Sequence, residues 1–154
     1  MSEPIPLIVS RWIKAPPEKL FAAFKDREEL PKWFIPDAAV TLEVRKFEFH
    51  KSGSFEFCYH QQGERAVVEG HFTALKAPSE LSFTWHWHAP NPLAQHPMHV
   101  RFDFRAEKEG TTVIVTHTGI PSSLSCVFQE TAWADTLQML ENYLSASLSQ
   151  EKAE

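Results

Sequence analysis

The chain has 154 residues, of which 43% are hydrophobic and 23% are charged. This size and balance predict one domain over residues 1–154, with an ordered core from about residue 5 to about residue 148. Fifteen Lys and Arg residues against twenty Asp and Glu give a net charge of −5, which argues against a nucleic-acid partner. Proline and polar residues interrupt every apolar run before the roughly 20 residues of a spanning helix, so no membrane insertion is expected.

The cysteines and the start of the chain indicate the compartment. Cys58 and Cys126 form neither a CxxC pair nor part of a Cys/His metal spacing, so no metal and no cofactor is expected. The first residues, Met1-Ser2-Glu3-Pro4, lack the basic and apolar stretches of a secretory signal. We therefore expect a cytoplasmic protein in which both cysteines act as small apolar residues.

The first third of the chain predicts a strand followed by two short helices. Residues alternate between apolar and polar faces over Ile5–Ile13, which is typical of a strand. Pro16-Pro17 ends this strand and opens a helix, because a proline at the first helical position lacks only an unused N–H. Asp26 and Glu29 resemble a capping box for a second helix, which Pro31 keeps short or kinked.

Six further strands are predicted between Val40 and Ile120. Each strand sorts apolar residues from polar ones, so the sheet has one dry face and one wet face. The alternation slips between Val44 and Phe47, which predicts a bulge. Short turn signals separate the strands and favour antiparallel hairpins. These signals are Lys51-Ser52-Gly53, Gln62-Gly63-Glu64, Ala77-Pro78-Ser79, Pro90-Asn91-Pro92 and Glu109-Gly110.

After Pro121 the apolar period changes to that of a helix of roughly twenty residues. Its stripe consists of Cys126, Trp133, Leu137, Leu140, Leu144 and Leu148. A sheet with one dry face needs a cover, and this amphipathic helix supplies it. The predicted fold is therefore α+β, with a curved seven-stranded antiparallel sheet wrapped around a long C-terminal helix.

Several local strings occur in an order that resembles a known family. They are residues 11–21 (RWIKAPPEKLF), Trp33-Phe34, Phe83-Thr84-Trp85, and Thr116-His117-Thr118-Gly119 followed by Trp133 and a leucine-rich tail. Together they resemble the homologues of the activator of the heat-shock protein 90 ATPase, within the START-like, helix-grip superfamily. The chain departs from the family pattern at Ser52, Ala132 and Pro31, where the family often has glycine, glycine and a continuing helix.

The resemblance implies a cavity between the sheet and the last helix, which relatives use for lipids, polyketides, plant hormones or other apolar molecules. Three functions stay open, because this fold alone does not select among them. The first is binding or sequestering a small hydrophobic ligand, and the second is polyketide cyclase-like catalysis. The third is a stress-related interaction module like the chaperone activator, which we disfavour because the chain has one such domain where the activator has two.

The cavity hypothesis also rests on an excess of large inward-facing side chains. Bulky rings on a curved sheet seldom pack without gaps, and a gap lined by rings holds an apolar ligand. The plain alternative is an ordinary core. The predicted ligand-binding residues are Trp33, Phe34, Phe57, Tyr59, Phe72, Trp85, Trp87, Phe102, Phe104, His117, Trp133 and Leu137.

No nucleophile elbow, P-loop, dinucleotide-binding fingerprint or HExxH motif is found, so no catalytic residue is assigned. A cyclase needs only a base and an oxyanion donor in an apolar cavity, and Tyr59, His117 or Arg11 could serve. The alternation places His117 on the dry face, either to orient a ligand or as a core histidine bonded to a backbone carbonyl.

Histidines also gather on the predicted wet face. His86, His88 and His99 lie on two consecutive strands, where they either bind a transition metal or are ordinary surface imidazoles. We favour the surface interpretation because these positions face solvent. The wet face or an exposed Trp12 also leaves open a homodimer, which the sequence does not test.

Overall fold

The computed structural model describes residues 6–91 and 93–153, so Ile5 and Pro92 of the predicted elements lie outside it. The strands of this part of the chain are β1 (Leu7–Ile13), β2 (Thr41–Phe47), β3 (Ser54–Gln61), β4 (Glu64–Lys76), β5 (Glu80–Trp87), β6 (Met98–Glu107) and β7 (Gly110–Thr118). The helices are α1 (Pro17–Ala22), α2 (Leu30–Trp33) and α3 (Ser123–Ala153). The predicted helix-grip fold is confirmed.

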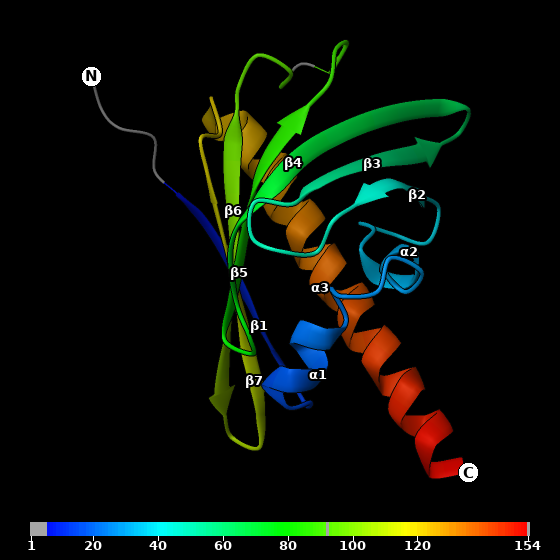
Figure 1. Cartoon of the computed structure of the whole chain (residues 1–154). Helices are drawn as coiled ribbons and strands as arrows, with labels where there is room; N and C mark the ends of the chain where they lie inside the picture. Colours follow the sequence, from blue (N-terminus) through cyan, green and yellow to red (C-terminus); the bar gives the residue numbers. More distant parts are fainter. Residues whose placement is uncertain (1–5, 92, 154) are drawn as a thin grey trace.

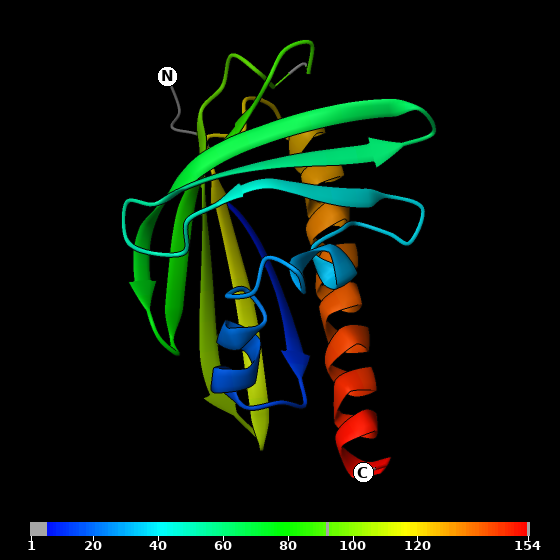
Figure 2. The ribbon, with the colours of Figure 1, turned by 45° about the vertical axis from the view of Figure 1, so that its right-hand side comes forward.

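The strands form one antiparallel sheet in the order β1-β7-β6-β5-β4-β3-β2. Residues 64–71 of β4 pair with β3 and residues 68–76 pair with β5, so this long strand joins the two parts of the sheet. Figure 1 shows β2, β3 and β4 bending over α3, and Figure 2 shows the same bend turned by 45°. The sheet therefore has a concave face against which α3 lies.

Two hairpins show why the predicted turn residues make turns. Gln62 and Gly63 both have positive φ angles, 50° and 80°, as do Lys108 and Glu109 at 51° and 62°. Two-residue loops of this kind match the right-handed twist of the paired strands. The predicted bulge is also confirmed, because the pairing of β2 with β3 shifts register between Val44 and Lys46.

The second helix corrects the predicted capping box. Asp26 Oδ1 accepts the Glu28 N–H at 2.8 Å instead of capping a helix, and α2 has only four residues. Pro31 explains the late start, because proline is tolerated in the first turn of a helix and breaks its interior. The helix therefore begins at Leu30, which places Pro31 in that first turn.

The C-terminal helix is longer than its apolar stripe predicted. It has 31 residues, and Trp133, Leu137, Leu140 and Leu144 are buried while Cys126 is half-buried. The side chain of Leu148, predicted to continue the stripe, lies outside the described side chains. Apolar periodicity reports where a helix packs and not where it ends. Among the described residues, no helix combines the length and the apolarity that crossing a bilayer requires.

The dry face is confirmed, but the wet face is not wet throughout. Met98, Val100, Phe102 and Phe104 of β6 are all buried, as the alternation predicted. On the other face Cys58, paired across the sheet with Glu43 and Val67, is also fully buried. The cysteine thus acts as a small apolar residue within the outer surface.

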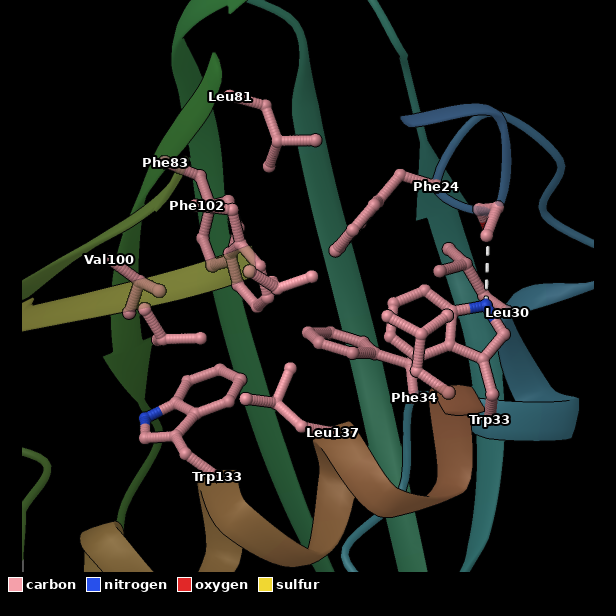
Figure 3. Packing of buried hydrophobic residues seen from close by; sticks show 14 of the residues in the cluster. Phe24, Leu30, Trp33, Phe34, Leu81, Phe83, Val100, Phe102, Trp133 and Leu137 are labelled. Carbon is pink, nitrogen blue, oxygen red and sulfur yellow. Dashed lines mark hydrogen bonds between the residues drawn. The ribbon is translucent and has the colours of Figure 1, made fainter. Parts of the chain in front are cut away.

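The centre of the core is a layer of rings between the sheet and the helices. In Figure 3, Trp133 and Leu137 rise from α3 toward Phe102 and Phe34. The ring of Phe102 lies 4.9 Å from that of Phe24 and 5.6 Å from that of Trp133, centroid to centroid. Edge-to-face pairs of this kind stabilise a core beyond their buried area.

Truncating Phe102 tests this layer. We expect Phe102→Ala to lower the free energy of unfolding by about 3–5 kcal/mol, because the side chain is fully buried and leaves a cavity. Phe128→Ala is the matched control, since Phe128 is 67% exposed on α3 and should change stability by less than about 0.5 kcal/mol. Urea unfolding followed by circular dichroism measures both, and equal losses would contradict the described core.

Candidate ligand-binding cavity

A cavity of about 260 Å³ lies between the hairpin of β3 and β4, the end of β5, the segment after α2 and the first turns of α3. Its apolar wall consists of Phe34, Pro36, Val40, Ala66, Trp85, Trp87, Ala132 and Trp133. Its polar lining consists of Tyr59, Gln61, Glu64, Arg65, Gln129 and Thr136. Gln61, Glu64 and Arg65 are exposed, so they form the rim through which solvent reaches the interior.

Two small residues explain why the rings leave this space. Ala66 on β4 and Ala132 on α3 both line the cavity, where the surrounding wall positions carry large rings. Close packing needs side-chain volume from both walls, and a methyl group on each wall does not supply it. The alanines are therefore the local sequence feature that keeps the cavity open.

The structure divides the predicted ligand-binding residues into two groups. Phe34, Tyr59, Trp85, Trp87 and Trp133 lie in the cavity wall. The others pack in the core away from this wall; they are Trp33, Phe57, Phe72, Phe102, Phe104, His117 and Leu137. Alternation therefore identified side chains that point inward, but it did not distinguish those that border the cavity from those that pack in the core.

Phe57 and Phe72 illustrate the second group. With Phe34 and other rings they surround a void of about 10 Å³. This volume is at the lower limit for a single water molecule, so this part of the aromatic cluster is solid core.

Sequence reasoning missed the rim and the small residues. Gln61 lies two residues after Tyr59 on the same strand, so the alternation that pointed Tyr59 inward could have indicated it. The sequence gives less indication that Ala66 and Ala132 border a cavity, because a small residue leaves a gap only if the side chains opposite it do not fill the space. Gln129 lies one helical turn before Trp133 and shares its face.

His117 supports the cavity wall from behind. Its Nδ1 accepts the Trp133 indole N–H at 2.9 Å, and its Nε2 lies 3.2 Å from Met98 Sδ. Because Nδ1 is an acceptor, the neutral ring carries its proton on Nε2, toward the sulfur. Burial, together with a smaller effect of nearby His99, lowers the pKa of His117 to about 4. His117 is thus a core histidine. Its partners are an indole and a thioether, and not the backbone carbonyl that the sequence suggested.

Both hydroxyl groups of the cavity lining are already donating. The Tyr59 hydroxyl donates to the Phe34 carbonyl at 3.1 Å, and the Thr136 hydroxyl donates to the Ala132 carbonyl at 2.8 Å. Burial raises the pKa of Tyr59, so its phenol stays neutral at physiological pH. Tyr59 is therefore held as part of the wall and is a poor base.

Arg11 lies away from the cavity, on β1. Its Nη2 donates to Gln138 Oε1 at 2.6 Å and to Glu141 Oε1 at 2.8 Å, which ties the edge strand to α3. With Tyr59 and His117 committed to other partners, the cyclase candidates named from the sequence do not provide an acid or base facing this cavity.

The histidines of the outer face bind separate partners. His86 Nε2 lies 2.7 Å from the Ala94 carbonyl oxygen, and His99 Nε2 lies 2.9 Å from Thr73 Oγ1. His88 instead lies 3.4 Å from Glu69. The surface interpretation of these three imidazoles agrees with this arrangement.

Among the described residues, two other groups bring metal-ligating atoms within 4.8 Å of one another. They are Glu43 with Cys58 and His60, and Glu56 with Glu69 and His88. Arg45 lies 3.5 Å from the Glu43 carboxylate and 3.6 Å from the Glu56 carboxylate. A guanidinium group thus already neutralises one carboxylate of each group, and the arrangement gives no reason to assign a metal.

A curved antiparallel sheet that grips a long C-terminal helix over a cavity defines the START-like, helix-grip class of proteins. Within that class, the family model described as Activator of Hsp90 ATPase homolog 1-like protein matches residues 14–145. Since the match covers most of the chain, the protein belongs to this family. The resemblance seen in the sequence is confirmed.

Solved structures support the same fold. The AHSA1 protein of Silicibacter pomeroyi is 25% identical with a TM-score of 0.80, over 93% of this chain and 99% of that one. A Staphylococcus epidermidis protein is 23% identical with a TM-score of 0.79, over 96% and 93% of the two chains. A Chromobacterium violaceum protein is 19% identical with a TM-score of 0.80, over 90% and 96%. A search of curated proteins found no match.

The buried imidazole predicts a pH dependence of stability. Its pKa falls from 6.5 to about 4 on folding, so the unfolded chain binds the proton more tightly and acid favours unfolding. The contribution of His117 is fully present above pH 6.5 and is lost as the pH falls toward 4. Between pH 7 and pH 5 the free energy of unfolding should fall by about 2 kcal/mol through His117 alone.

His117→Gln isolates this contribution, because glutamine keeps an oxygen acceptor for Trp133 and does not titrate. Urea unfolding at pH 7 and pH 5 should show a pH effect about 2 kcal/mol smaller in this variant than in the wild type. His50→Gln is the control, since His50 is exposed. An identical pH effect in wild type and His117→Gln would contradict a neutral buried imidazole.

Proposed function

We propose that the protein binds a small apolar ligand in the cavity between the sheet and α3. The observation that carries the proposal is a cavity of about 260 Å³. Its wall includes the rings of Phe34, Trp85, Trp87 and Trp133. Sites for apolar ligands are concave, lined mainly by hydrophobic and aromatic side chains, and oriented by a few polar groups. The described wall and rim have this composition.

The volume restricts the ligand. A cavity of about 150 Å³ binds benzene, and drug-sized ligands occupy about 300–1,000 Å³. The volume here lies between these values, so it suits one ring or two fused rings better than a long acyl chain or a multi-ring polyketide. Aromatic walls favour flat rings that stack on them or meet them edge to face.

The polar groups support a binding role over a catalytic one. Tyr59 and Thr136 donate to backbone carbonyls, and His117 is behind Trp133 with its acceptor nitrogen occupied. A cyclase needs a group inside the cavity that exchanges a proton with the substrate. These three side chains are held in structural bonds, and the Glu64 carboxylate lies at the exposed rim. We therefore place a small-molecule binder or carrier ahead of the cyclase-like alternative.

Filling the cavity tests the proposal. Ala132→Phe adds a ring to the wall, and Ala134→Phe adds the same ring at an exposed position two residues further along α3. Naphthalene is the probe, and isothermal titration calorimetry measures its affinity for both variants and the wild type. We expect Ala132→Phe to weaken binding more than tenfold and Ala134→Phe to leave it unchanged, because only the first occupies ligand volume.

Thermal unfolding of both variants verifies that each is folded before binding is measured. Equal naphthalene affinity for the wild type and Ala132→Phe would place the probe outside this cavity. A wild type that binds neither naphthalene nor any other compound of one or two rings would contradict the proposed function.

A further inference from the structure

The polar atoms of the cavity lining differ in whether they already have partners. The hydroxyl protons of Tyr59 and Thr136 are both donated to backbone carbonyls. A hydroxyl group has one proton and two lone pairs, so each oxygen keeps only acceptor capacity toward a ligand. The inner wall therefore offers oxygen acceptors at these two side chains.

The indole of Trp133 offers a ligand no donor. Its N–H is directed to His117 Nδ1 at 2.9 Å, and an indole has no second proton to give. The ring therefore presents an apolar surface to the cavity, and its position is fixed by the bond behind it.

Trp87 differs from the other groups. Its Nε1 is buried and has no hydrogen-bond partner among the described residues. A buried donor without an acceptor is uncommon and unfavourable, and an acceptor on a ligand removes this penalty. The nitrogen is covered by neighbouring atoms, so an acceptor reaches it only when the half-buried indole turns within the wall.

Trp87 and Tyr59 are neighbours, with ring centroids 6.0 Å apart. Both side chains line the same cavity, and the indole N–H needs an acceptor while the phenol oxygen can still accept, so the pair is matched by one ligand group that does both. At the rim, Glu64 and Arg65 are adjacent and carry opposite charges, so the entrance favours neither an anion nor a cation. These features select a neutral ligand group that both donates and accepts.

We infer that the ligand is an aromatic molecule of one or two rings that carries a hydroxyl group, held between Trp87 Nε1 and Tyr59 Oη. This inference rests on the proposed function, because it assumes that the cavity is the binding site. A hydrocarbon lacks both interactions, and an ether can accept but not donate. A hydroxyl group makes both.

Three probes of nearly the same shape separate these cases. They are 2-naphthol, 2-methoxynaphthalene and naphthalene, titrated by calorimetry into the full chain. We expect 2-naphthol to bind most tightly and naphthalene least tightly, with a loss of about two- to tenfold for each missing hydrogen bond.

Two variants assign the interactions to their residues. Trp87→Phe removes the indole N–H, and Tyr59→Phe removes the phenol oxygen, while both keep a ring in the wall. Each should reduce the preference for 2-naphthol over naphthalene, and the naphthalene affinity of the same variant corrects for any change in the wall. Trp12→Phe is the control, since the Trp12 indole is exposed on β1 and donates to the Glu107 carbonyl.

The outcomes distinguish this inference from the proposed function. Equal affinities of the wild type for all three probes would overturn recognition of a hydroxyl group and leave the cavity as a binding site. A hydroxyl preference that persists in both variants would overturn its assignment to Trp87 and Tyr59. A wild type that binds none of the probes would contradict the proposed function itself.

Discussion

The contact between Trp133 and His117 is the interaction on which the cavity depends. Trp133 projects from α3 onto the concave face of the sheet, and its indole N–H is held by the buried imidazole at 2.9 Å. The same ring packs 5.6 Å from Phe102 and 6.0 Å from Trp85. Because Trp133 is part of the cavity wall, this hydrogen bond and these ring contacts hold that wall in place.

One layer of rings produces both a solid core and a cavity. Around Phe57 and Phe72 the rings close to a void of about 10 Å³, whereas beside Ala66 and Ala132 about 260 Å³ stays open. The difference comes from side-chain volume, because the sheet at Ala66 and the helix at Ala132 each contribute only a methyl group. The hydroxyl groups of Tyr59 and Thr136 beside the open space are bonded to backbone carbonyls, which is the arrangement that the proposed binding role draws on.

Much of this architecture was predictable from local pattern. Alternation along β5 and β6 identified their inward side chains, and the slip near Val44 identified the bulge. Pro17 marked the start of α1, and the stripe through Leu137 marked the face of α3 that packs. Each of these signals depends on backbone geometry within a few residues, so the sequence carries it directly. The family came instead from the resemblance of local strings such as Trp33-Phe34, which the family model over residues 14–145 confirms.

Tertiary structure decided the rest. The predicted capping box failed because Pro31 moved the start of α2, and Cys58 is buried on the face predicted to be wet. Sequence alone placed His117 inside, and only the fold brought it to Trp133 across 16 residues. Alternation determines the face on which a side chain lies, but a cavity depends on the summed volumes of elements distant in sequence. The pattern therefore identified the rings, and packing alone determined which of them border open space.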